Sequence, residues 1–141
     1  MPGWDEETWC ALYEIGRMTV AVKAPVAEIQ AAYLAAYQFR PRGAEPLYQL
    51  TRFHRKRSEY ALAYLFAKRA AAIPQPPDLL FDDRSVYLWR SLDKLSVAAS
   101  YVREIDEGPA AVTERLLADG HIPLAERPRI GDNSRFYLSK R

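Results

Sequence analysis

The side chains with the clearest chemical potential form a basic run over residues 52–57, R-F-H-R-K-R. Helical spacing places Arg52, Arg55 and Lys56 on one side of a helix. Cations gathered on one face with an aromatic ring among them are typical of a nucleic-acid patch. The same run also suits the solvated C-terminal end of a helix, where the dipole favours cations. The formal net charge of only +2 favours this second interpretation and makes nucleic acid an unfavoured partner.

A second candidate site surrounds the predicted start of the same helix, where Arg40, Arg42 and Glu45 lie close in sequence. Free backbone amides at a helix start attract anions, and arginine forks bind carboxylate or phosphate. A phosphorylated or acidic ligand is therefore one hypothesis. The favoured alternative is structural, with an arginine paired to Glu45 as a polar lock between neighbouring helix pairs.

The chain is rich in tyrosine, with nine residues of this type and three tryptophans. A tyrosine buries its ring and keeps a hydroxyl for a partner, which suits both helix packing and a ligand groove. Packing is the default interpretation for most of them. Tyr48 and Tyr64 are predicted to face a concave ligand surface, and with Arg40, Arg42, Glu45 and Arg52 they complete the predicted partner-binding set.

Residues for catalysis or metal binding do not group into any known pattern. His54 and His121 lie far apart in sequence, and neither has the companions of a zinc site. Cys10 follows Trp9 and is predicted to be an inert, buried thiol. Neither G-x-G-x-x-G nor a P-loop is present to hold a nucleotide. The sequence predicts no catalytic residue, no metal and no cofactor, and hence a chain that is not an enzyme by itself.

Composition indicates an ordinary globular protein, because 49% of the 141 residues are hydrophobic and 27% are charged. The single cysteine excludes an intramolecular disulfide. The N-terminus is acidic and polar, and no apolar run reaches membrane-spanning length. These features predict a cytoplasmic protein that has no membrane partner.

Prolines and apolar periodicity predict three antiparallel helix pairs. The first covers residues 4–18 and 25–39, the second runs from Pro46 to Pro74, and the third begins near residue 84 and ends near 118. Between the second and third pairs, residues 74–78 read P-Q-P-P-D and cannot be helical throughout. Prolines, two glycines and an Asp-Asn pair in residues 120–141 predict extended chain or turns that pack on the helices. The predicted organisation is a repeat domain over 1–119 and a tail over 120–141.

The spacing of small residues in these pairs resembles the tetratricopeptide repeat. Small side chains at such positions let the two helices of a pair approach closely. The matching repeat positions are Gly16, Ala36, Pro41, Leu50, Ala63, Ala70 and Pro74. A generic helical bundle is the alternative, since alanine is simply the best helix former. The predicted fold is therefore an all-α, tetratricopeptide-like α-solenoid with an irregular tail.

A more specific resemblance covers nearly the whole chain. Residues 33–48, Y-L-x-A-Y-x-x-R-P-x-x-A-E-P-L-Y, and the later V-Y-x-W of residues 86–89 resemble the helical region of bacterial glycosyltransferases that contain tetratricopeptide repeats. The resemblance implies a separate α/β catalytic domain with a metal-binding D-x-D. This chain has no D-x-D and no alternating strand and helix pattern. The resemblance, without these catalytic features, therefore implies an accessory or acceptor-binding role.

The function predicted first is a noncatalytic interaction or scaffold module with a protein or peptide partner. Self-association is part of this prediction, because the open ends of a repeat stack can add another copy. The alternatives are an accessory portion of a glycosyltransferase and a nucleic-acid-binding helical protein.

Overall fold

A computed structural model describes residues 2–74, 86–102, 109–118 and 121–139 of the chain, and these are helical with short connections and no strand. The helices are α1 (Pro2–Ala21), α2 (Val26–Phe39), α3 (Glu45–Lys56), α4 (Tyr60–Ala72), α5 (Ser91–Ala99), α6 (Pro109–Ala118) and α7 (Arg127–Ser139). A π-helical segment, η1 (Val86–Arg90), leads into α5, and a 3₁₀ turn, η2 (Leu124–Glu126), leads into α7. The all-α class is confirmed. The predicted break at residues 75–78 lies outside the described residues.

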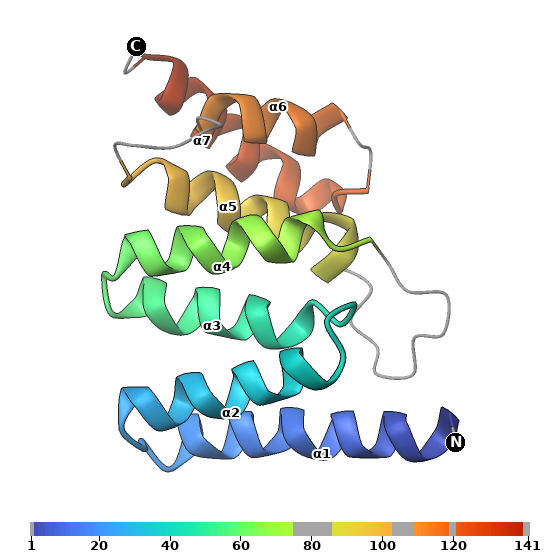
Figure 1. Cartoon of the computed structure of the whole chain (residues 1–141). Coiled ribbons are helices and arrows are strands. Elements are labelled where there is room, and N and C mark those ends of the chain that lie inside the picture. Colours follow the sequence, from blue (N-terminus) through green and yellow to red (C-terminus); the bar gives the residue numbers. More distant parts are fainter. Residues whose placement is uncertain (1, 75–85, 103–108, 119–120, 140–141) are drawn as a thin grey trace.

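Helices α1 to α5 lie side by side in chain order, α6 and α7 overlap beyond α5, and the two termini lie at opposite ends of the stack (Figure 1). Each helix from α1 to α7 contacts the next one along the chain, and α3 also contacts α5. Within the described residues, no helix is long and apolar enough to cross a membrane.

Prolines set several helix boundaries as the sequence predicted. Pro25 is the N-cap residue of α2, and Pro46 lies in the first turn of α3, where its missing N–H is not needed. At the end of α4, Ile73 has extended backbone angles, φ −86° and ψ 119°, immediately before Pro74. This geometry is what a following proline favours.

Two glycines allow close packing at the α1 end of the stack. A Cβ atom on Gly16 would lie 2.6 Å from the Tyr33 ring, so glycine lets α1 and α2 meet. A Cβ atom on Gly43 would lie 2.9 Å from the Trp9 ring, which stacks on Tyr13 at a centroid distance of 5.6 Å. A side chain at either position would clash with an aromatic ring, so both positions require glycine.

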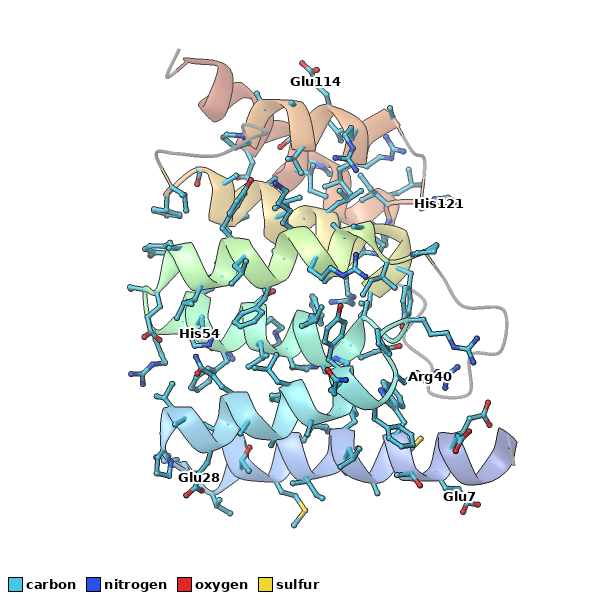
Figure 2. The ribbon with its side chains drawn as sticks, in the orientation of Figure 1. Glu7, Glu28, Arg40, His54, Glu114 and His121 are labelled. Carbon is cyan, nitrogen blue, oxygen red and sulfur yellow. The ribbon has the colours of Figure 1, made fainter. Side chains whose placement is uncertain are left out.

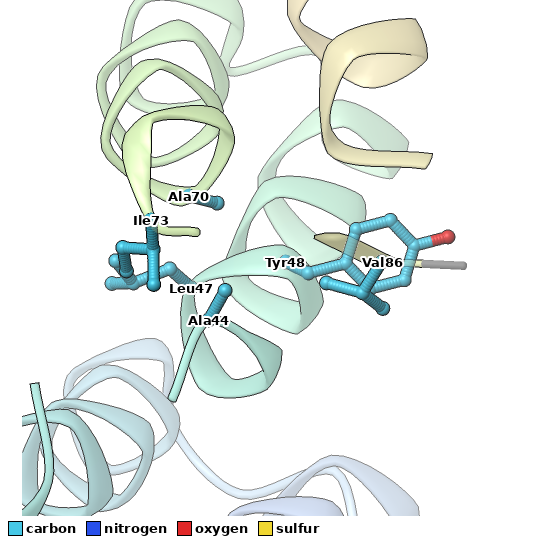
Figure 3. Close-up of a cluster of buried hydrophobic side chains, with 6 residues drawn as sticks. All are labelled: Ala44, Leu47, Tyr48, Ala70, Ile73 and Val86. Atoms are coloured by element: carbon cyan, nitrogen blue, oxygen red, sulfur yellow. The ribbon is translucent and has the colours of Figure 1, made fainter. Parts of the chain in front are cut away.

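The middle of the stack is built from small and branched side chains. One buried cluster joins α3, α4 and η1 (Figure 3), and its members are Ala44, Leu47, Tyr48, Ala70, Ile73 and Val86. The predicted repeat positions Ala36, Leu50, Ala63 and Ala70 are all buried, whereas Pro41 and Pro74 follow α2 and α4 and are exposed. Small residues therefore lie where adjacent helices approach.

The prediction of an irregular tail is wrong for residues 127–139, which form α7. Pro128 occupies the second residue of the helix, where a proline costs no hydrogen bond. Ile130 is 1% exposed and packs with Trp89, Leu116 and Ile122. Burial of this face stabilises a helix whose sequence reads as turn-forming.

Candidate functional site

A cavity of about 240 Å³ opens between α1, α2 and α3. Its lining combines cationic, amide and apolar side chains, namely Arg17, Val20, Tyr33, Gln49, Arg52, Phe53 and Lys56. Arg52 and Lys56 are one helical turn apart on α3, and Arg17 faces them from α1. Of the predicted partner-binding residues, only Arg52 lines this cavity.

The cations of the cavity differ in how they are neutralised. Arg17 donates to Glu14 at 2.9 Å on the exposed surface of α1. Arg52 lies with its Cζ atom 5.9 Å from the centroid of the Tyr48 ring, a cation–π contact. Within the described part of the chain, no carboxylate pairs with Arg52 or Lys56. The cavity therefore keeps an excess of positive charge.

This positive charge continues from α3 onto α5. Burial lowers the pKa of the Lys94 ammonium, Asp93 opposes this shift, and Arg55, Arg129 and Arg52 lower the pKa further. Neither Arg55 nor Lys94 forms an ion pair among the described residues. We refer to Arg52, Arg55, Lys56 and Lys94 as the cationic strip.

Arg129 belongs to this neighbourhood but is already paired. Its two terminal nitrogens donate to the Asp93 carboxylate at 3.2 and 3.0 Å, and its Nε donates to Glu126 at 2.9 Å. The Asp93 side chain is only 4% exposed. This bidentate contact holds α7 against α5.

Arg40 and Glu45, two of the residues predicted around the start of α3, lie at a junction between helices. The Tyr87 hydroxyl donates to Glu45 Oε2 at 2.6 Å and accepts the Ala44 N–H at 2.9 Å. Burial raises the pKa of Tyr87, and the hydrogen bond to Glu45 raises it further. The Arg40 Cζ atom lies 5.9 Å from the centroid of the Trp9 ring. We refer to Arg40, Ala44, Glu45 and Tyr87 as the junction lock.

The pairing of an arginine with Glu45 stays a prediction, because the hydrogen bond described for Glu45 comes from Tyr87. Glu45 is 4% exposed, so its carboxylate is held inside the protein. Arg42 is exposed beside it. Figure 2 shows Arg40 at the α2–α3 turn, and His54 at the other end of α3. The cavity is lined by α3 from Gln49 onward and does not include the residues of the lock.

The two predicted tyrosines have different positions. Tyr48 is 4% exposed within the buried cluster, which contradicts its predicted place on an open surface. Its ring fills the space between α3 and Val86. Tyr64 is partly buried against Ala67, Leu95 and Val112, and Lys68 lies 6.0 Å from its ring centroid. Packing is therefore the observed role of Tyr48.

Sequence reasoning missed a polar cluster around His54, whose side chain is fully buried. Its Nδ1 lies 3.2 Å from Glu59 Oε1, and its Nε2 lies 3.1 Å from Gln30 Nε2. Hydrogen bonds from His54 and Arg57 lower the pKa of Glu59. The spacing of His54 and Glu59 across the α3–α4 turn was the available signal. The cluster ties this turn to α2.

The described residues contain no group of three or more histidine, cysteine, aspartate or glutamate side chains that could hold a metal ion. Cys10 is partly buried, and burial raises the pKa of its thiol. A raised pKa disfavours the nucleophilic thiolate.

Comparison of the chain with known protein families, curated proteins and solved structures finds no match. The geometry of the cavity and of the cationic strip is therefore the basis for assigning a function.

Proposed function

We propose that this chain is a noncatalytic interaction module, built as a tetratricopeptide-like stack, that binds an acidic, extended segment of another protein. The observation that carries the proposal is the cationic strip, whose four side chains lie on α3 and α5 without carboxylate partners among the described residues. An extended segment that crosses α3 and α5 would supply the missing negative charge.

The packing of helix pairs supports the repeat assignment. Gly16 of α1 meets Tyr33 of α2, and Ala63 of α4 is fully buried in the interior. Stacked helix pairs of this kind create extended concave surfaces on which ligands bind. In this proposal the cavity lined by α1, α2 and α3 would open on such a surface.

The location of charge supports an anionic partner. Isolated cations on a helix surface are common, but Lys94 is partly desolvated and is repelled by Arg52 and Arg55. The repulsion between these cations lowers the stability of the folded protein, and an anionic partner would reduce that repulsion on binding. Net charge alone conceals this surface, because acidic residues elsewhere balance it.

Fluorescence anisotropy with a labelled peptide of consecutive glutamates tests this function, with a glutamine peptide of the same length as the reference. We expect the glutamate peptide alone to bind, and the double variant Arg52→Gln/Lys94→Gln to weaken binding by about tenfold or more. Arg69→Gln is the control for the loss of one cation and is compared with Arg52→Gln alone, because Arg69 lies on α4 and donates to Tyr37 at 3.0 Å, outside the cavity lining.

The same assay separates this function from nucleic-acid binding. Oligothymidylate that binds more tightly than the glutamate peptide, with a steep loss of affinity as salt rises, would support nucleic acid instead. Equal binding of the glutamate and glutamine peptides would contradict the proposal.

An accessory role in a glycosyltransferase stays a prediction that rests on the sequence resemblance. In that role the cavity and the cationic strip would hold an acceptor for a separately encoded catalytic domain. Co-purification of an α/β transferase with the tagged chain would support this role. Purification of the tagged chain without a transferase would count against it.

Self-association also stays a prediction, and one surface favours it. Ile15 and Met18 on α1 and Val22 in the turn after it are 50%, 62% and 73% exposed, and α1 lies at the end of the stack. A second copy added to this end would cover them. Light scattering over a range of concentrations should show a mass above the monomer that Met18→Glu reduces.

A further inference from the structure

The cavity between α1 and α3 concentrates more positive charge than a single carboxylate requires. Arg17, Arg52 and Lys56 line it from two helices, and no acidic side chain is among the lining residues. Glu14 contacts Arg17 from outside the lining. Two arginine forks and an ammonium can donate to several acceptor oxygens at once.

The uncharged part of the lining suits the stem of a side chain. Tyr33 is buried, Phe53 is partly buried, and Val20 lies beside Arg17 on α1. Gln49 is held in place because its amide donates to the Tyr13 hydroxyl at 3.1 Å. An anionic head that reaches the cations therefore brings its carbon stem against apolar and aromatic surface.

The size of the cavity limits what it can hold. Its volume of about 240 Å³ is below the range of about 300–1,000 Å³ typical of sites for drug-sized molecules. A single side chain with a compact anionic head fits this description better than a complete nucleotide does. The rest of the ligand must then lie outside, along the cationic strip.

We propose that the cavity binds a phosphate monoester on a side chain of the partner segment. This inference rests on the proposed function, since the strip would hold the acidic residues that flank the phosphorylated one. A phosphate monoester carries a charge of about −1.5 to −2 and three acceptor oxygens near neutral pH, whereas a carboxylate carries a single charge and two oxygens. The phosphate therefore matches the cations of Arg17, Arg52 and Lys56 more fully.

The test uses three labelled peptides that share one glutamate-rich sequence and differ at a central position, which is phosphoserine, serine or glutamate. Anisotropy should show the phosphoserine peptide binding about tenfold more tightly than the serine peptide, with the glutamate peptide between them. Arg52→Gln and Lys56→Gln should each remove most of this preference, whereas Arg69→Gln should leave it unchanged. Circular dichroism confirms that each variant is folded.

The outcomes distinguish the two proposals. Equal affinity for the phosphoserine and serine peptides, both weakened by Lys94→Gln, would overturn the phosphate site and leave the interaction function standing. Failure of all three peptides to bind would overturn both. Displacement of the phosphoserine peptide by millimolar inorganic phosphate, with no displacement of the serine peptide, would support the site.

Discussion

The junction lock and the cationic strip are both rich in polar side chains, but they use them in opposite ways. In the lock, Tyr87 bonds to Glu45 and to the backbone of Ala44, and the carboxylate of Glu45 is buried. In the strip, Arg55 and Lys94 lack carboxylate partners among the described residues. Polar groups that pair with each other hold helices together, whereas cations without a carboxylate partner are available to a ligand. Pairing, more than residue type, separates structure from function here.

Tyr87→Phe should have the largest effect, and it should act on stability alone. The variant removes the donor to Glu45 and the acceptor of the Ala44 N–H together. Leaving such buried groups without partners should lower the free energy of unfolding by about 2–3 kcal/mol. Urea denaturation measures this change.

Tyr101→Phe provides the matched control, because Tyr101 is 59% exposed and its ring stacks on Tyr60. Its loss of a hydroxyl should change the free energy of unfolding by less than about 0.5 kcal/mol. Equal effects of the two variants would show that the lock contributes nothing specific. Affinity for the glutamate peptide should stay unchanged in both.

Alkaline pH should weaken the lock and the α1–α2 interface. Burial raises the pKa of Tyr33 to about 12, and it also raises the pKa of Tyr87. An unfolded tyrosine ionises near pH 10, so the unfolded chain releases these protons first. The stabilisation is complete below about pH 10 and is lost as pH rises toward 12.

Urea denaturation at a series of pH values tests this expectation. The free energy of unfolding should fall by about 1.4 kcal/mol per pH unit for each such tyrosine above pH 10. Tyr87→Phe should show a shallower fall than the parent protein. A free energy of unfolding that stays constant to pH 12 would contradict the burial of these hydroxyls.

Arg129→Met compares two cations in the same neighbourhood, one paired and the other unpaired among the described residues. Arg129 is paired and, within that part of the chain, Arg55 is not, and both lie close enough to Lys94 to lower its pKa. Removing Arg129 leaves the buried Asp93 carboxylate without its bidentate partner. Water reaches the guanidinium, which is 45% exposed, so we expect a loss of about 1–2 kcal/mol. Thermal denaturation should show Arg55→Met within about 0.5 kcal/mol of the parent. A larger loss of stability in Arg55→Met than in Arg129→Met would mean that Arg55, and not Arg129, makes the structural contact.

The sequence predicted the helix pairs well because prolines and apolar spacing are local signals. Pro25, Pro46 and Pro74 lie at or beside the predicted helix ends. Helix α7 was missed because its stability depends on Ile130 packing against Trp89 and Leu116, which are distant in sequence. Tertiary burial overrode the turn-forming residues.

The candidate site was predictable only in part. Arg52, Arg55 and Lys56 share a helix, so their common face follows from spacing. Arg17 and Lys94 join them from α1 and α5, and a single sequence does not reveal that proximity. Tyr48 was assigned to a surface because aromatic residues suit ligand grooves and cores equally, and its burial depends on Val86.

Apart from the control variants, Lys94→Met should have the smallest effect on stability, and it is the most informative about the strip. Burial and the neighbouring Arg55, Arg129 and Arg52 lower the pKa of Lys94, which shows that its charge is unfavourable in the folded protein. Replacing it with an apolar side chain of similar length should raise the free energy of unfolding by about 0.5–1 kcal/mol. Added salt should narrow this gap by screening the repulsion. The same variant should bind the glutamate peptide more weakly than the parent protein. Higher stability together with weaker binding is the result expected of a charge that is retained for a ligand. A lower stability of Lys94→Met would mean instead that this ammonium stabilises the fold, as the paired groups of the junction lock do.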